Sequence, residues 1–171
     1  MQHQTPVSCA SIHYDREADL VQDFLGLLEE GVSPWGTVET TTEWDYRTGI
    51  TDVLARTTEG HLVAFEAKLT DWRRATHQAY RNTTFVERAY VVMPTKAAER
   101  ARAHADIFAR YGVGLCAVQK NSVSIIIEAP ELDEEPLLPW MNRKAHLFFD
   151  EAAGCGMTIA KRHNNGSLQA A

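Results

Sequence analysis

The segment that ends at Lys68 closes an apolar run with two charged residues, Glu66 and Lys68, one residue apart. Another acid, Asp52, lies in the apolar segment before it. Two carboxylates beside a lysine are residue types that can catalyse the hydrolysis of a phosphodiester bond by water. The acids hold a hard divalent cation such as Mg²⁺, and the lysine orients or deprotonates a water or stabilises charge at phosphorus. This chemistry requires a fold that brings the three side chains together.

A hairpin is the element that would position them. The segments 49–56 and 61–68 have the length and composition of two strands, and we expect a three-residue loop that ends in a left-handed glycine. In that register Asp52 lies directly across from Glu66, with Cβ atoms roughly 5 Å apart. Lys68 projects from the same face as Glu66, because side chains alternate along a strand. Since opposed like charges destabilise a hairpin, a cation bound between the carboxylates would explain the pair.

A helix is predicted on each side of this hairpin. The stretch 15–30 has apolar residues at helical spacing, and Glu17 falls on the apolar side, so we expect it to point to the interior. Asp19 is the competing acid on this helix. A second helix begins at Trp72.

The helix that begins at Trp72 is basic on one side, which carries Arg73, Arg74, His77 and Arg81. Facing outward, these side chains would grip a nucleic acid backbone without reading its sequence. The alternative is an ordinary solvated helix face. A neighbouring face of small residues and amides is expected to lie against the sheet: Ala75, Gln78, Ala79 and Asn82.

The other elements complete an α/β order. We predict a strand over 37–46, a strand over 87–94, a helix over 95–111 with Thr95 as cap and Gly112 as stop, and strands over 113–119 and 122–129. The acidic stretch 129–138 is expected to form an exposed loop. In the region 139–171 we expect a last helix, docked through Trp140, Leu147 and Phe148, and then a flexible tail.

Composition bounds the class of protein. The 171 residues, 44% of them hydrophobic, fit a single domain. No apolar stretch approaches the ~20 residues of a membrane span, and the start lacks a secretion signal, so we expect a cytoplasmic protein. The three cysteines form no CxxC pair, which predicts reduced thiols. The net charge of −6 argues against unspecific coating of nucleic acid, so any basic patch must be local.

Asp52 followed by Glu66-Ala67-Lys68, in this order of elements, resembles the PD-(D/E)xK nuclease superfamily. The likeness covers a core from about residue 15 to 128, and Thr51 stands where the superfamily's name has a proline. The resemblance implies a restriction-endonuclease-like fold, a mixed central β-sheet flanked by helices. It also implies hydrolysis of nucleic acid, DNA rather than RNA, with Mg²⁺ or Mn²⁺.

The resemblance implies roles for particular residues: metal ligands at Asp52, Glu66, the carbonyl of Ala67 and Glu17, a catalytic Lys68, and Gln78 beside the site. Each has a plainer interpretation. Glu66 and Lys68 would then be a solvent-facing pair on an edge strand, Glu17 an acid suited to a helix N-terminus, and Gln78 an amide bonded to the sheet. The whole chain could instead be a non-catalytic module that docks a partner protein through its acidic loop, or a ribonuclease. The sequence is also compatible with a homodimer.

Overall fold

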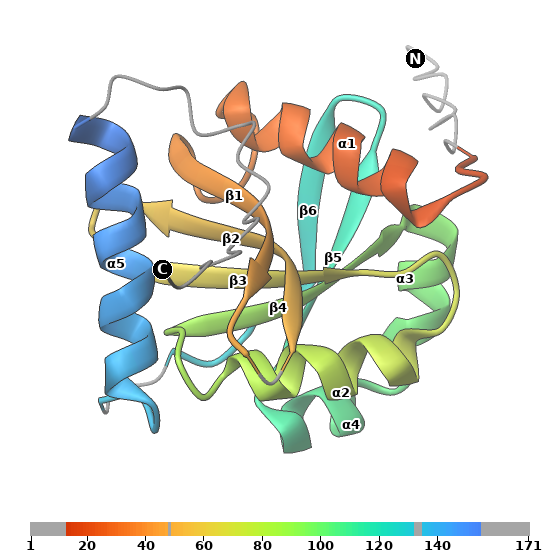
Figure 1. The fold of residues 1–171 in the computed structure, drawn as a ribbon. Coiled ribbons are helices and arrows are strands. Elements are labelled where there is room, and N and C mark those ends of the chain that lie inside the picture. Colours follow the sequence, from red (N-terminus) through yellow and green to blue (C-terminus); the bar gives the residue numbers. More distant parts are fainter. Residues whose placement is uncertain (1–12, 48, 132–134, 155–171) are drawn as a thin grey trace, which may run out of the picture.

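Within residues 13–47, 49–131 and 135–154, which the computed structural model describes, six strands form one mixed sheet (Figure 1). In chain order, which is also their order in the sheet, they are β1 (Val38–Asp45), β2 (Ile50–Thr57), β3 (Leu62–Ala67), β4 (Arg88–Pro94), β5 (Gly114–Gln119) and β6 (Ser122–Ile127). The pairs β3–β4 and β4–β5 are parallel and the other pairs are antiparallel.

The helices of the described residues cover both faces of this sheet. They are α1 (Glu17–Glu29), α2 (Trp72–Asn82), α3 (Thr95–Arg102), α4 (Ala105–Tyr111) and α5 (Pro139–Gly154). Helix α1 packs on one face, and the other four helices pack on the opposite face (Figure 1). This arrangement confirms the predicted fold class, an α/β fold with a mixed central sheet flanked by helices.

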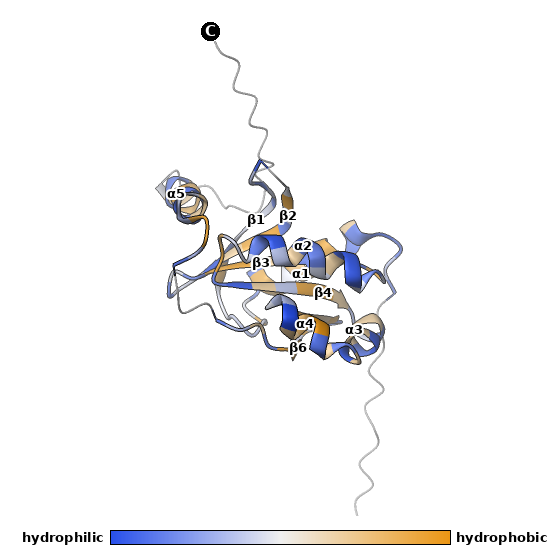
Figure 2. Ribbon diagram, turned by 90° about the horizontal axis from the view of Figure 1, so that it is seen from below, coloured by the Kyte–Doolittle hydropathy of each residue, from blue (hydrophilic) through white to orange (hydrophobic). Residues whose placement is uncertain are grey.

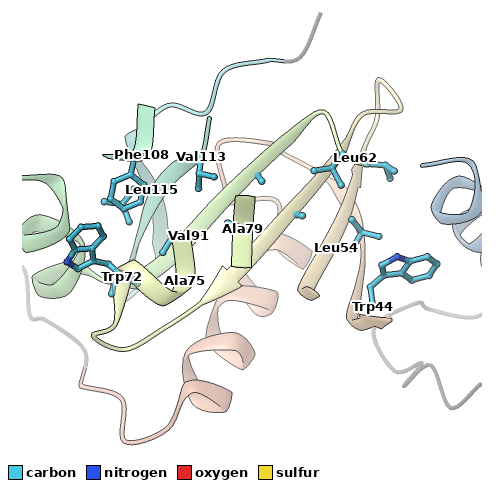
Figure 3. Close-up of a cluster of buried hydrophobic side chains, with 14 of the residues drawn as sticks. Trp44, Leu54, Leu62, Trp72, Ala75, Ala79, Val91, Phe108, Val113 and Leu115 are labelled. Atoms are coloured by element: carbon cyan, nitrogen blue, oxygen red, sulfur yellow. The ribbon is translucent and has the colours of Figure 1, made fainter. Parts of the chain in front are cut away.

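Strand β3 runs through the centre of the molecule, and all six of its residues are buried. Leu62 and Ala64 face the side of α2, whereas Val63 and Phe65 face the side of α1. A strand that is buried on both faces has a nearly continuous apolar sequence instead of an alternating one. Figure 3 shows the first of these two cores, where the alanines of α2 lie over the sheet. Small side chains there allow the helix axis to lie close to the strands.

The C-terminal helix α5 docks through a different set of residues from the predicted one. Its buried residues are Met141, Ala145, Phe149 and Ala152. Trp140 and Leu147 are 48% and 58% exposed, so the expectation that they anchor the helix is wrong. Phe148 does pack on the sheet, edge to face against Trp44 at 4.9 Å. The buried set is spaced by three or four residues along one side of the helix, which turns Trp140 and Leu147 to the opposite side.

The predicted single helix over 95–111 is two helices, α3 and α4. The chain leaves helical geometry at His104, with φ −113° and ψ 33°, and the His104 ring stacks on Trp72 at 4.5 Å. Nothing in the local sequence marks this break, because it contains neither glycine nor proline. Thr95 does not cap α3; it is the first helical residue, and its hydroxyl donates to a carbonyl of β5. Gly112 ends α4 as predicted, with a left-handed φ of 63°.

Some expectations fall outside the described residues: the flexible tail, Cys9, Cys155 and the middle of the acidic loop. Cys116 is buried in β5 with a free thiol, as expected. Among the helices that the structure describes, none is long and apolar enough to cross a membrane.

Candidate active site

The β2–β3 hairpin has the predicted register. Gly60 has a left-handed φ of 86°, as the three-residue loop requires. Val53 pairs with Phe65, so the next facing positions toward the open end of the hairpin are Asp52 and Glu66. The two acids therefore lie across from one another where β2 begins and β3 ends.

Asp52 and Lys68 are tied to the backbone at this end of the hairpin, beside α1. The main-chain N–H of Ala67 donates to Oδ2 of Asp52 at 2.8 Å. Nζ of Lys68 donates to Oε2 of Glu17 and to the carbonyl of Ala67, both at 2.9 Å. The side chain of Lys68 is only 11% exposed, whereas that of Glu17 is 49% exposed. The expectation that Glu17 points to the interior is therefore wrong: it opens α1 at the rim and reaches down to Lys68.

The carboxylate of Glu66 is completely buried beneath α2. Nδ2 of Asn82 donates to Oε1 of Glu66 at 2.8 Å, and Oγ1 of Thr51 donates to Oδ1 of Asn82 at 2.9 Å. The second carboxylate oxygen, Oε2, is also buried and has no hydrogen-bond partner in the described part of the chain. A buried polar atom without a partner is costly. This oxygen therefore marks a position where a bound ligand would be stabilised.

The charges around this end of the hairpin are coupled. Burial raises the pKa of Glu66 to about 8, and the charge of Asp52 pushes the pKa in the same direction. The hydrogen bond from Asn82 and the charges of Lys68 and Arg81 oppose the rise. Burial likewise raises the pKa of Asp52, against the N–H of Ala67 and the charge of Lys68. The two carboxyl groups therefore resist being ionised together near neutral pH unless further positive charge is present.

A groove of about 500 Å³ lies between α1 and β1, and Glu17, Glu43 and Asp52 are among its lining residues. Glu43 stands opposite Asp52 in the β1–β2 register and has a positive φ of 50°. Its charge contributes to the raised pKa of Asp52. Because its polar side is acidic, this groove is unfavourable for a polyanion.

The basic residues predicted on α2 are all exposed on the outer side of that helix: Arg73, Arg74, His77 and Arg81. Arg81 is near enough to the site for its charge to act on Glu66, whereas the Arg73 guanidinium lies 4.4 Å above the Trp72 ring. Gln78 is half-buried, and its Oε1 is buried without a hydrogen-bond partner in the described residues. In those residues no hydrogen bond joins Gln78 to the two acids or to Lys68.

The sequence did not assign a role to Asn82 or Thr51. Asn82 was expected on the face of α2 that lies against the sheet, and it does lie there, with 0% exposure. Thr51 directly precedes Asp52, and its residue type indicates no role. Their joint role depends on a contact between residues 31 positions apart, and no local pattern encodes such a contact.

The oxygen atoms at this site fit a hard divalent cation. Mg²⁺ is usually bound through one or two carboxylates, with water and substrate oxygens as further ligands. Asp52, Glu66 and the carbonyl of Ala67 supply oxygen donors of this kind, and Oε2 of Glu66 lacks any other partner in the described residues. Within the same described part, no three His, Cys, Asp or Glu side chains cluster closely enough to hold a metal ion. A cation here would therefore depend on water and substrate to complete its coordination.

No family model matches this chain, and no curated protein matches it. Among solved structures it is similar to a protein of unknown function from Silicibacter pomeroyi, with 14% identity and a TM-score of 0.48 over 76% of this chain and 84% of that chain. It is also similar to EndoMS in a complex with double-stranded DNA, with 17% identity and a TM-score of 0.41 over 64% of this chain and 48% of that chain.

A repair endonuclease from Pyrococcus abyssi is 19% identical with a TM-score of 0.37, over 64% of this chain and 50% of that chain. The chain thus spans about half the length of the two endonucleases that it matches.

Proposed function

We propose that this chain is a metal-dependent nuclease that hydrolyses phosphodiester bonds of nucleic acid, DNA in the first place, at the site of Asp52, Glu66 and Lys68. The observation that supports it most is the buried carboxylate of Glu66, whose Oε1 is anchored by Asn82 while Oε2 lacks a partner in the described residues. Burying a charge beside a second carboxylate is costly. A cation bound between the two acids would offset that cost.

The chain's own residues divide the work of hydrolysis in this proposal. Asp52, Glu66 and the carbonyl of Ala67 would hold Mg²⁺ or Mn²⁺, which supplies Lewis-acid stabilisation of the phosphate when bound. Lys68, held by Glu17, donates a hydrogen bond to the attacking water or to a phosphoryl oxygen. The water oxygen bonds to phosphorus, the bond from phosphorus to the leaving sugar oxygen breaks, and a proton from the water ends on that oxygen.

Helix α2 would serve the substrate. Arg73, Arg74, His77 and Arg81 lie on its outer side and would contact backbone phosphates, where charge-assisted bonds add affinity without reading sequence. Gln78 lies one turn before Asn82, and its partnerless Oε1 would accept a hydrogen bond from a water or from the substrate. Glu17 would position Lys68 through its Oε2, which accepts from Nζ, and its second carboxylate oxygen, Oε1, would serve as a further ligand of the cation, directly or through water.

The test is a cleavage assay on single- and double-stranded DNA and RNA with Mg²⁺, Mn²⁺ or EDTA. We expect cutting that requires a metal and that falls by about 100-fold or more in Lys68→Ala, the scale for loss of a preorganised charge or donor at phosphorus. Asp52→Ala should be equally impaired. Lys120→Ala is the matched control, because Lys120 is an exposed turn lysine, and it should cut at the wild-type rate.

Thermal unfolding of each variant separates loss of chemistry from loss of fold. Cutting by Lys68→Ala at the wild-type rate would remove the lysine from the mechanism. No metal-dependent cutting of any substrate would overturn the proposed function in favour of a non-catalytic module, and cutting of RNA alone would make the chain a ribonuclease.

A further inference from the structure

The outer side of α2 and the end of α4 form one surface of aromatic rings and arginines. We define this ring-and-arginine face by Arg74, His77, Tyr80 and Arg81 of α2 and by Arg110 and Tyr111 of α4. Helix α2 is drawn largely in hydrophilic blue in Figure 2, in contrast to the orange strands. Tyr80 nevertheless stands on it with half of its surface, 50%, exposed.

The three rings of this face are clustered around Tyr111. His77 lies edge-on to Tyr111 with ring centroids 5.0 Å apart, and Tyr80 lies at 61° to Tyr111 with centroids 5.2 Å apart. Each ring therefore limits the rotation of its neighbour. In this ordered pair Tyr80 is half-exposed and Tyr111 is partly buried against the core, so the pair offers flat apolar area chiefly through Tyr80. Such a surface suits a flat ligand that stacks.

The ring-and-arginine face is positively charged, whereas the chain as a whole is negatively charged. Helix α2 carries three arginines and no acid, in a protein of net charge −6. Arg74, Arg81 and Arg110 make no ion pair within the part of the chain that the structure describes. Arginines that form no direct ion pair, on the same surface as aromatic rings, are complementary to a polyanion with flat bases.

One residue of the face lies close to the candidate active site. Arg81 acts electrostatically on the buried Glu66, and it belongs to the same exposed side of α2 as Tyr80. A helix with its side chains is only about 10–12 Å across. A nucleic acid strand with one phosphate at the site can therefore lay its neighbouring nucleotides over α2.

We propose that the ring-and-arginine face binds single-stranded nucleic acid, with bases stacked on Tyr80 and Tyr111 and phosphates held by the arginines. This inference rests on the proposed function, of which it names the substrate class. Exposed rings select single strands, because the base faces of a duplex are already stacked on one another. A duplex would meet only the arginines.

Fluorescence anisotropy of labelled single-stranded oligonucleotides and of the matching duplex, in EDTA, tests this proposal. Tyr80→Ala should weaken single-strand binding about tenfold, within the range for loss of one base–aromatic stack. Tyr80→Phe should keep it, because the ring remains. Trp140→Ala is the control, since Trp140 is an equally exposed aromatic on α5, and it should bind as the wild type does.

Salt dependence provides a second readout. Arg81→Ala should weaken binding and reduce the slope of log K against log salt concentration by about 0.7. Unchanged single-strand binding in Tyr80→Ala would overturn the proposal, and so would a wild-type protein that binds only duplex. Capture of a protein partner on this face without any oligonucleotide binding would also overturn it.

Because binding is measured without metal, its outcome is independent of cleavage. A protein that cuts nucleic acid but binds single strands equally well without Tyr80 overturns this inference and leaves the proposed function standing. A protein that never cuts nucleic acid but binds single strands through Tyr80 overturns the proposed nuclease function and supports the binding role of the ring-and-arginine face.

Discussion

The substitution Glu66→Gln should remove a pH dependence from the stability of the metal-free protein. Glu66 has 0% exposure, and burial raises the pKa of its carboxyl from 4.5 to about 8. Between pH 4.5 and about pH 8 the Glu66 carboxyl holds a proton in the folded state that it has released in the unfolded state. Stability is therefore complete below about pH 4.5 and falls as the pH rises through about 8. Glutamine has the same shape and cannot ionise.

The size of the effect follows from the pKa. A carboxyl pKa raised from 4.5 to about 8 corresponds to about 5 kcal/mol of unfolding free energy, at about 1.4 kcal/mol for each pKa unit. Burial raises the pKa of Asp52 as well, so the two carboxyls titrate as a pair and the loss is spread over the interval. For a domain of this kind, with about 5–15 kcal/mol of stability in total, the effect is large.

Urea unfolding at a series of pH values from 4 to 9, in EDTA, measures this dependence. The wild type should lose stability with rising pH, Glu66→Gln should lose much less, and Glu151→Gln, at an exposed position on α5, should behave as the wild type. Adding Mg²⁺ at pH 8 should stabilise the wild type more than Glu66→Gln, because a ligand stabilises the state that it binds. Equal slopes for wild type and Glu66→Gln would refute the reasoning.

Two further substitutions test the support of Glu66 and, away from the site, the close packing of β5 against Tyr90. Asn82→Ala should lower the free energy of unfolding by about 1–3 kcal/mol, because Oε1 of Glu66 and the Thr51 hydroxyl lose their partner. It should also raise the pKa of Glu66 further. Unfolding measured over a range of pH, with Asn121→Ala as the control, checks both expectations, and an unchanged unfolding midpoint would contradict them. Gly114→Ala should destabilise by about 1–3 kcal/mol, because its Cβ would clash with the Tyr90 ring and lie 2.8 Å from the backbone N of Ala129. Gly26→Ala, which has open space, should be neutral or stabilising in the same thermal unfolding assay.

The helix over 95–111 shows where local sequence patterns mislead. Its composition favours a helix throughout, yet the structure breaks the helix at His104, whose ring stacks on Trp72. Thr95 has the residue type of a cap, yet its hydroxyl donates to the neighbouring strand β5 instead. In both places a tertiary contact overrides the local preference.

The site shows the same division between local and distant contacts. The facing of Asp52 and Glu66 was predictable, because a three-residue loop and strict alternation fix the register over a few residues. The partner of Lys68 was not, because Glu17 lies 51 residues away and half-exposed at the rim of α1. The support that Asn82 gives to Glu66 was likewise out of reach of spacing rules.

The sequence by itself determined the order of the elements, the register of the central hairpin and the basic side of α2. Each of these depends on turn geometry or on periodicity within one segment. Only the tertiary structure decided that Glu66 is wholly buried with one oxygen unpartnered in the described residues, and that Lys68 is held by Glu17. The physical reason is that desolvation and charge coupling arise from groups brought together by packing, whatever their separation along the chain.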